Sequence, residues 1–354
     1  MRGLILAGGE GSRLRPITLA VPKHLIPLLG RAMIEYPVQH LVEAGVGDIG
    51  VVVGYLGHLI RGYLGDGSRY GARFVYVEQP ERLGIAHAIH LAVEAGFFDG
   101  SFVVYLGDNV LAGGIGKYVG RFLEEEPDVY ILLSRVRDPS RFGVAVVRDG
   151  RVVRLVEKPR ERVADLAVVG VYMFRDPDLV ERAYASLKPS WRGEYEVTDL
   201  IQWFIDNGYR VLYDVVDGWW KDVGTPEGLL EALYLLLDSI EPRLEGELAG
   251  EAVGRVIVER GAVVEGRVYG PAYVGRNAYI GRGAVVEQYT SLESGVRMAS
   301  GGASRTLVMD NAFVDVGRLR LVDSVLGRFS VVRCSRELHG ELRLAVSDYS
   351  RVEI

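Results

Sequence analysis

The sequence predicts an α/β domain followed by a parallel β-helix. Two observations carry this prediction. Apolar strand-like runs alternate with segments of helical period up to about residue 240, and apolar residues then recur at six-residue intervals. A length of 354 residues with 49% hydrophobic content leaves room for two cores, so we expect domains at residues 1–241 and 242–354.

The elements of the first domain indicate a mostly parallel sheet. Continuous apolar strands joined by helical crossovers imply a sheet covered on both faces, with ligands bound beyond the carboxyl ends of its strands. The predicted strands are 2–8, 48–55, 72–79, 101–109 and 128–136, and the predicted helices are 33–45, 84–96 and 116–126.

The pattern is less regular from residue 142 onward. FGVAVVRDGRVVRLVEKP predicts a β-hairpin that turns at Asp149 and Gly150. A strand at 166–175 and helices at 176–187 and 198–208 complete the domain.

The second domain shows a six-residue apolar repeat, which is typical of a parallel β-helix whose short rungs each bury one side chain. The repeat starts at Val258 and Val264, slips by four residues, and becomes irregular after residue 300. Its later members are Val274, Ile280, Val286, Leu292 and Met298.

Composition limits the class of protein. No apolar run reaches membrane-spanning length, no signal-like region opens the chain, and Cys334 is the only cysteine, so we expect a cytoplasmic protein. The net charge of −6 argues against nucleic-acid binding. An anionic ligand therefore needs a local concentration of positive charge.

The opening segment LAGGEGSRLRPIT has that concentration. Gly8, Gly9 and Gly11 follow a strand and free the backbone amides to face an oxygen-rich ligand, and Arg13 comes directly after them. Neither common phosphate signature is complete: Leu14 stands where GxGxxG needs a third small residue, and no P-loop lysine is present. A plain structural turn is the alternative.

Lysine is rare in this chain. Only five of its 41 basic residues are lysines, and the rest are arginines. A lysine that remains can mark a site that needs a compact charge on a flexible stem, as for Lys23 and Lys158, although compositional bias is an equal explanation.

LAGGEGSRLRPIT with PKHLIP resembles the signature of the sugar-1-phosphate nucleotidyltransferases, in particular the long-form glucose-1-phosphate thymidylyltransferases with a tail like DYSRVEI. Further landmarks follow in that family's order: EQPERLGIAHA, YLGDN, RFGVAVV, EKP, AVVGVYMF, WRGEYEVTD and GWWKDVGTPE. The resemblance implies a Rossmann-like sheet, a left-handed parallel β-helix, and transfer from dTTP to glucose-1-phosphate with Mg²⁺. Because thymine and uracil differ by one methyl group, worth roughly 0.8 kcal/mol when buried, UTP stays an alternative.

The resemblance also implies roles for single residues. Asp108 and Asp222 would hold Mg²⁺, although a helix cap and a turn residue are the structural alternatives. Arg13 would bind the leaving phosphates, Lys23 the α-phosphate, and Lys158 with Arg192 the sugar phosphate. The nucleotide-binding set is Leu6, Gly8, Gly9, Gly11, Ser12, Arg13, Lys23, Gln79 and Gly84, and the sugar-phosphate set is Asn109, Gly143, Glu157, Lys158, Val168, Tyr172, Arg192 and Trp220.

Other classes are less consistent with the sequence. An oxidoreductase lacks its complete fingerprint, and a non-catalytic regulatory homologue would not need the charged set. A bifunctional enzyme with acyltransferase activity has only His339 as a histidine base beyond residue 240. We assign His24, His87 and His90 structural roles, and expect the β-helix to help assemble a homo-oligomer.

Overall fold

The computed structural model describes residues 1–354 and divides into two compact units. The first comprises residues 1–10 and 34–222, and the second residues 11–33 and 223–354. Within the second unit, the boundary expected at residue 241 falls between helix α7 (Pro226–Asp238) and strand β14 (Arg243–Leu244). The boundary itself stays a prediction.

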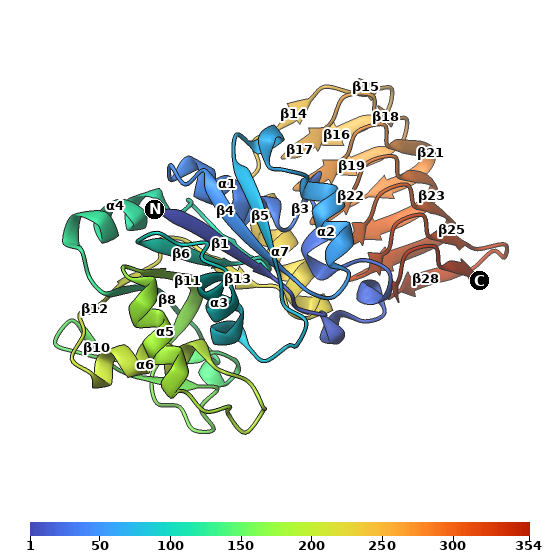
Figure 1. The fold of residues 1–354 in the computed structure, drawn as a ribbon. Helices are drawn as coiled ribbons and strands as arrows, with labels where there is room; N and C mark the ends of the chain where they lie inside the picture. Colours follow the sequence, from blue (N-terminus) through green and yellow to red (C-terminus); the bar gives the residue numbers. More distant parts are fainter. The chain divides into compact units, whose positions relative to one another are not determined.

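The first unit is built on a nine-stranded sheet. Strands β5, β4, β1 and β6 lie side by side and parallel, and β6 is then paired antiparallel with β11 (Figure 1). The strands of this unit are β1 (Arg2–Ala7), β4 (Asp48–Val53), β5 (Arg73–Glu78), β6 (Phe102–Leu106), β7 (Asn109–Leu111), β8 (Val129–Arg135), β9 (Gly143–Arg148), β10 (Arg151–Glu157), β11 (Leu166–Phe174), β12 (Val211–Val215) and β13 (Trp220–Asp222).

Helices cover this sheet, because its strands are apolar on both faces. Leu4 and Leu6 of β1 belong to a core that includes Ile89 and Phe204 from two of the helices. The helices are α1 (Glu35–Glu43), α2 (Gly57–Leu64), α3 (Ile85–Glu94), α4 (Gly116–Glu125), α5 (Pro177–Ser186) and α6 (Val197–Asp206), with α3, α5 and α6 packed together (Figure 1). None of the protein's helices is long and apolar enough to span a membrane.

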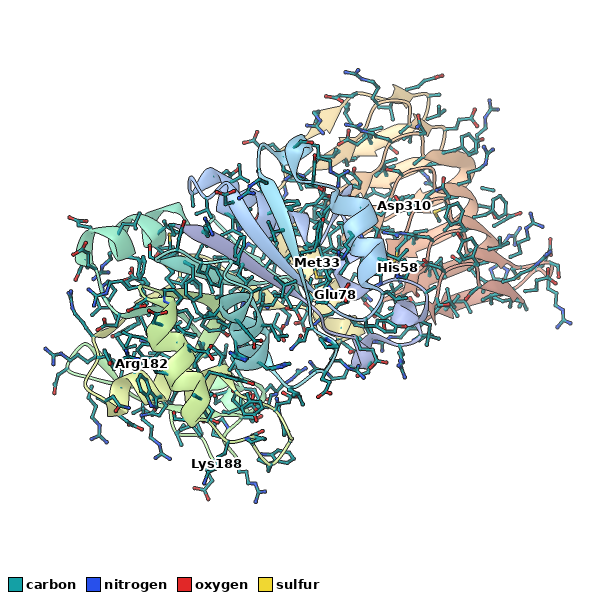
Figure 2. All side chains as sticks on the ribbon, in the orientation of Figure 1. Met33, His58, Glu78, Arg182, Lys188 and Asp310 are labelled. Carbon is teal, nitrogen blue, oxygen red and sulfur yellow. The ribbon has the colours of Figure 1, made fainter.

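Local chemistry explains the predicted elements that the structure contains. Asp149 and Gly150 join β9 to β10 with φ of 50° and 72°, as a two-residue hairpin turn requires, so the predicted hairpin is confirmed. Helix α5 begins where the Asp176 side chain accepts a hydrogen bond from the Asp178 amide, with proline at the first helical position. Arg182 and Lys188, at and beyond this helix, point into solvent (Figure 2).

The second unit contains a C-terminal solenoid, residues 243–353, of short parallel strands in two sheets. Each turn of the chain adds one strand to the seven-stranded sheet and one or two strands to the ten-stranded sheet, as expected of a parallel β-helix. The remaining strands of this unit are β2 (Pro27–Leu28), β3 (Arg31–Ala32), β15 (Glu247–Leu248), β16 (Glu251–Val253), β17 (Val256–Val258), β18 (Val263–Val264), β19 (Arg267–Tyr269), β20 (Ala272–Val274), β21 (Tyr279–Val286), β22 (Thr290–Leu292), β23 (Arg297–Ser304), β24 (Leu307–Val308), β25 (Phe313–Val322), β26 (Val325–Leu326), β27 (Val331–Arg333), β28 (His339–Leu342), β29 (Ala345–Val346) and β30 (Arg351–Glu353).

The six-residue repeat marks the solenoid core. All seven apolar residues of the repeat are buried, from Val258 to Met298. The turns continue beyond residue 300, where Val308, Val314 and Val332 are also buried. The repeat becomes irregular there because β25 is ten residues long, two more than β21 and β23, and pairs with β23 with shifts in register.

Candidate active site

The carboxyl ends of the four parallel strands meet at one edge of the first unit's sheet. Gly8 follows β1, Gly54 follows β4, Gln79 follows β5, and Asp108 lies just beyond β6. This edge is where an open α/β sheet binds its ligands. Six of the predicted site residues are therefore at or next to it: Leu6, Gly8, Gly9, Gln79, Asp108 and Asn109.

Asn109 joins the two predicted metal ligands. Its Nδ2 lies 3.0 Å from Oδ1 of Asp108 and 3.4 Å from Oδ1 of Asp222, since β7 and β13 pair with Asn109 opposite Asp222. Its Oδ1 accepts hydrogen bonds from the Gly170 amide at 3.2 Å and from Trp220 Nε1 at 2.7 Å. The buried amide thus holds two carboxylates together, and its predicted contact with sugar hydroxyls stays a prediction.

This acidic pair fits Mg²⁺. The ion takes hard oxygen ligands and is commonly held by one or two carboxylates together with waters and substrate phosphates. The carboxylates of Asp108 and Asp222, on either side of Asn109 Nδ2, could supply these protein ligands. The protein has no group of three or more histidine, cysteine, aspartate or glutamate side chains arranged to hold a metal.

A second charged cluster surrounds Glu157. The Glu157 carboxylate accepts a hydrogen bond from Thr198 Oγ1 at 3.2 Å, and its Oε1 lies 3.4 Å from Lys158 Nζ and 4.0 Å from Arg192. Burial raises the pKa of Glu157, against the opposing charge of Arg192 and the Thr198 hydrogen bond. The structure therefore brings together Glu157, Lys158 and Arg192, which the sequence assigned to the sugar phosphate.

Arg192 has one hydrogen-bond donor that the protein leaves unused. Its guanidinium also bonds Glu194 and Glu196, but its buried Nε has no hydrogen-bond partner in the protein. Lys158 is held at a φ of 41°, in the left-handed region. A buried donor without a partner beside a lysine suits an anionic ligand.

Gly143, Val168 and Tyr172 line the same region. A Cβ on Gly143 would lie 2.5 Å from Thr198 Cγ2 and 3.1 Å from Glu157 Oε2, so only glycine fits there. Burial, together with the negative charges of Glu157, Asp222 and Asp108, raises the pKa of Tyr172. Strand β11 carries Val168, beside Gly143 and the Glu157 cluster, and Gly170, whose amide binds Asn109, so the acidic pair and the Glu157 cluster are neighbours.

Gln79 is held in one orientation. Its Nε2 donates to the Gly84 carbonyl at 3.2 Å and lies 3.4 Å from His87 Nδ1. Because a carbonyl only accepts, Nε2 must face Gly84 and Nδ1 of His87 must accept. The Oε1 atom then faces Gly8, where a Cβ would lie only 2.7 Å away.

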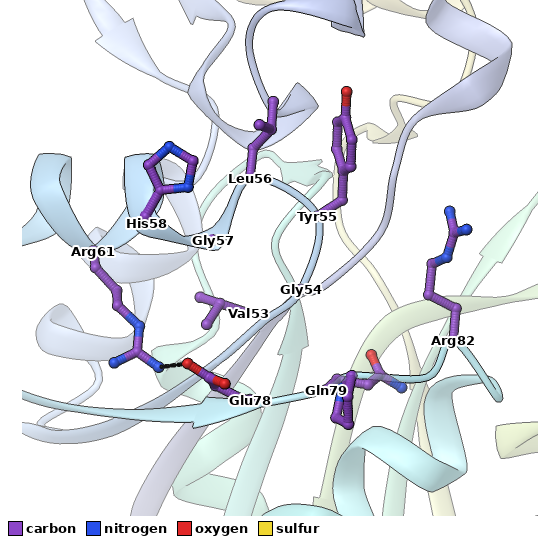
Figure 3. Close-up of a pocket in the computed structure, with 11 residues that line it drawn as sticks. Val53, Gly54, Tyr55, Leu56, Gly57, His58, Arg61, Glu78, Gln79 and Arg82 are labelled. Atoms are coloured by element: carbon purple, nitrogen blue, oxygen red, sulfur yellow. Dashed lines mark hydrogen bonds and ion pairs between the residues drawn. The ribbon is translucent and has the colours of Figure 1, made fainter.

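A cavity of about 600 Å³ opens beside Gln79 at the ends of β4 and β5 (Figure 3). Arg61 on its wall pairs with Glu78 at 2.9 Å. The cavity is lined by Val53, Gly54, Tyr55, Leu56, Gly57, His58, Arg61, Glu78, Gln79, Pro80 and Arg82.

The charged part of the opening segment belongs to the second unit, with Gly11, Ser12, Arg13 and Lys23. Gly11, at a φ of 66°, starts a 3₁₀ turn (Ser12–Leu14), and its carbonyl accepts a hydrogen bond from Thr18 Oγ1 at 2.8 Å. A Cβ on Gly11 would lie 3.2 Å from Lys23 Cβ. The stem of the lysine side chain therefore packs on the glycine backbone. A Cβ on Gly224 would lie 2.7 Å from the Arg13 guanidinium, so this guanidinium packs against Gly224.

Sequence reasoning missed several residues of these clusters. Thr198 binds Glu157, and His87, expected only to pack, contacts Gln79. Thr198 lies in the landmark WRGEYEVTD, so that motif was the available signal. Nothing in the local sequence distinguishes His87 from a packing histidine at helical spacing.

The chain belongs to the nucleotidyl transferase family, whose model matches residues 2–239. It is 38% identical over its full length to a glucose-1-phosphate thymidylyltransferase of Streptomyces griseus, covering 99% of that protein. A low-salt glycan biosynthesis nucleotidyltransferase of Haloferax volcanii is also 38% identical, with all of both chains covered. A solved structure from Bacillus anthracis, provisionally described as a glucose-1-phosphate thymidylyltransferase, matches with a TM-score of 0.63 at 36% identity, over 68% of this chain and 96% of that one. The resemblance seen in the sequence is confirmed, and the protein is a nucleotidyltransferase.

Proposed function

We propose that this protein transfers a thymidylyl group from dTTP to glucose-1-phosphate and releases pyrophosphate. The observation that carries the proposal is the acidic pair held by Asn109 beside the cluster of Glu157, Lys158 and Arg192. The first suits a metal and nucleotide phosphates, and the second suits a sugar phosphate. The printed names of full-length relatives support the same reaction.

In the proposed reaction an oxygen of the sugar phosphate attacks the α-phosphorus of the nucleotide. A new P–O bond forms while the bond from the α-phosphorus to the bridging oxygen breaks, and pyrophosphate leaves with the electron pair. No protein nucleophile is needed, so the side chains act by positioning and by offsetting charge. Mg²⁺ bound at Asp108 and Asp222 would neutralise phosphate charge.

The remaining residues have separate roles in this proposal. Arg13 binds the leaving phosphates as a planar fork, and Lys23 binds the α-phosphate as a point charge. Lys158 and Arg192 hold the sugar phosphate, while Glu157 accepts hydrogen bonds from the sugar hydroxyls. The backbone of the glycine segment faces the nucleotide.

Gln79 suits recognition of the base. With Nε2 turned to Gly84 and His87, its Oε1 is the atom available to accept from the imide N–H of a pyrimidine. Thymine and uracil share that edge. A UTP–glucose-1-phosphate uridylyltransferase of Haloferax volcanii is 35% identical over 66% of this chain, so UTP is the second candidate nucleotide.

We also propose the finer features that the sequence suggested. The solenoid is a left-handed β-helix, supported by its short rungs and six-residue repeat. The protein works in the cytoplasm as a homo-oligomer, supported by one free cysteine and by a solenoid that ends in strand edges. Acyl transfer has little support, because His339 is exposed and contacts Arg318.

Pyrophosphate release over a panel of nucleotides and sugar phosphates tests the proposal. We expect activity with dTTP and glucose-1-phosphate that requires Mg²⁺ and is lost with chelator. Preference for UTP would replace dTTP by the second candidate. Absence of pyrophosphate with every pair would overturn the function.

A further inference from the structure

A buried carboxylate of the solenoid binds the backbone of the opening segment. Glu293 follows β22 and is fully buried. Its Oε1 accepts hydrogen bonds from the Leu29 amide at 3.1 Å and from Ser291 Oγ at 2.6 Å, and its Oε2 accepts from the Gly30 amide at 2.7 Å. Both oxygens are therefore used, and every partner is a donor.

The segment is shaped to meet this carboxylate. Leu29 and Gly30 form the turn between β2 and β3 with φ of 54° and 77°, which aims two successive amides at one acceptor. A Cβ on Gly30 would lie 2.3 Å from the Tyr273 hydroxyl, so glycine is required for the close approach. Burying a carboxylate is costly, and its retention here requires these hydrogen bonds.

A second contact holds the same segment from the solenoid. The Arg328 guanidinium donates to the Leu25 carbonyl, and Arg328 Nε lies 3.4 Å from Asp310, which Figure 2 labels. The Arg328 amide in turn donates to Asp348 at 2.8 Å. The chain from Leu25 to Gly30 is thus held at both ends.

This segment is continuous with the proposed phosphate-binding residues. Lys23 opens the 3₁₀ turn (Lys23–Leu25) whose last carbonyl binds Arg328, and its stem packs on Gly11. A shift of the turn at Leu29 and Gly30 would therefore be passed along a short, packed stretch to Lys23.

We propose that Glu293 is a positioning residue for nucleotidyl transfer: it fixes the turn that holds Lys23 in place, so the C-terminal solenoid sets the geometry of the phosphate-binding segment. The inference rests on the proposed function. It gives the solenoid a role in the reaction that assembly alone does not provide.

The solenoid supplies a matched control. Glu259 follows β17 as Glu293 follows β22, two strands apart in the same sheet, and it is also buried. Its carboxylate instead pairs with Arg243 at 2.6 Å, within the solenoid. Glu259→Gln therefore removes a similar carboxylate without touching the opening segment.

The test combines amide hydrogen exchange with kinetics on the full chain at pH 8, where Glu293 is ionised and accepts all of these hydrogen bonds. In Glu293→Gln, an amide N–H replaces one acceptor and opposes a backbone donor, so exchange of residues 26–33 should speed up by about 10-fold or more. The kcat should fall by roughly 10- to 100-fold, as for loss of an orienting partner, while the KM for sugar phosphate stays unchanged. Ser291→Ala, a milder change, should produce a smaller effect of the same kind, and Glu259→Gln should produce neither.

Each outcome decides the inference. Unchanged exchange of residues 26–33 in Glu293→Gln overturns it, as does faster exchange with unchanged kcat. Equal loss of activity in Glu259→Gln also overturns it, because a general effect on the solenoid would then be the cause. A wild-type enzyme inactive with dTTP and UTP would instead overturn the proposed function, while the exchange result would still report the contact.

Discussion

At the scale of single residues, the acidic pair is the proposed Mg²⁺ site. Asp108→Asn and Asp222→Asn each remove the charge of a proposed ligand with little change in volume, so the fold should persist. Outer-shell partners of a metal are worth about 10- to 100-fold in activity, and a direct ligand should cost at least about 100-fold. Pyrophosphate release as a function of Mg²⁺ concentration measures this.

Asp217→Asn is the matched control for that pair. Asp217 is largely exposed and pairs with Lys117, so its loss should leave turnover unchanged. Near wild-type rates for both Asp108→Asn and Asp222→Asn at saturating Mg²⁺ would show that the pair has another role.

Lys23→Arg tests whether a point charge is needed. The chain uses arginine almost everywhere, yet has lysine here. A planar fork on this stem should misplace the contact with the α-phosphate, and a displacement of about 1 Å can cost roughly 100-fold. Lys117→Arg, at an exposed ion pair, should be silent in the same assay. Equal activity of the two variants would argue for compositional bias at residue 23.

His87→Leu tests the orientation of Gln79. Losing the Nδ1 acceptor should raise the KM for nucleotide by about 5-fold, the value of one hydrogen bond, with little change in kcat. His90→Leu is the control, because His90 lies on the same helix, α3, but stacks on Tyr184 and bonds Glu181 of α5. An unchanged nucleotide KM in His87→Leu would return this histidine to a packing role.

If His87 orients Gln79, binding of the nucleotide base should also depend on the protonation of His87. Burial and the charge of His90 lower the pKa of His87, which keeps its ring neutral near pH 7. Protonation would place an N–H against the Gln79 amide, so the nucleotide KM should rise only at acidic pH, below the ordinary histidine pKa. In His87→Leu that rise should be absent.

The positions of the candidate site residues were predictable from the sequence only where a motif carries them, and their roles stay predictions. Asp108, Asp222 and Lys158 lie in recognisable landmarks, and the structure brings their neighbourhoods together in the first unit. The contacts of Asn109 and His87 depend on which atoms their side chains meet across the fold. A linear sequence does not show those partners.

At the scale of elements, the contact of Glu293 with the turn at Leu29 and Gly30 should make the stability of the protein depend on pH. Burial raises the pKa of Glu293 to about 7 from 4.5, despite the Ser291 hydrogen bond, and nearby Asp310 raises it further while the Gly30 and Leu29 amides lower it. Arg328 contacts Asp310 and Asp348 in the same region. Between pH 4.5 and 7 the folded protein therefore holds a proton on Glu293 more tightly than the unfolded chain does.

The sign of this effect can be measured. Protonation of Glu293 stabilises the folded protein fully below about pH 4.5. This stabilisation, on the order of 3 kcal/mol of unfolding free energy, is lost as the pH rises through about 7. Urea unfolding of wild type and Glu293→Gln at pH 5 and pH 8 should show a smaller pH slope in the variant. Parallel slopes would mean that Glu293 does not titrate in this range.

Most elements could be predicted because their signals are local. The hairpin at Asp149 and Gly150 and the buried repeat from Val258 to Met298 follow from turn chemistry and periodicity. Helix α2 and the short strands β7 and β13 were not predicted, since eight- and three-residue elements carry little periodicity. Strand β12 and the thirteen-residue helix α7 were also not predicted. The solenoid turns beyond residue 300 were hidden by rungs of unequal length.

At the scale of the whole molecule, the change of texture near residue 240 predicted two kinds of architecture but not the membership of residues 11–33. Those residues lie in the second compact unit together with the solenoid. The contact between Leu29 and Glu293 joins residues 264 apart, and no local pattern encodes such a pairing. The opening segment, which we propose binds phosphate, is therefore tied to a solenoid far along the chain.

That tie changes what truncation should do. From the sequence alone, a chain ending at Glu241 is expected to keep transfer chemistry and lose only stability or assembly. Such a chain retains Lys23 but lacks Glu293, Arg328 and Tyr273, so the turn at Leu29 and Gly30 has no acceptor and no packing partner there. We now expect kcat to fall by at least about 100-fold, more than in full-length Glu293→Gln, because two contacts are lost together.

Light scattering and steady-state kinetics on both chains separate the two roles of the solenoid. If it only assembles the protein, the truncated chain should be smaller but turn over normally at each active site. If it also shapes the phosphate-binding segment, full-length Glu293→Gln should keep the wild-type assembly size and still lose activity. A truncated chain with wild-type kcat would contradict the positioning role, and an unchanged assembly size after truncation would contradict the proposed part of the solenoid in assembly.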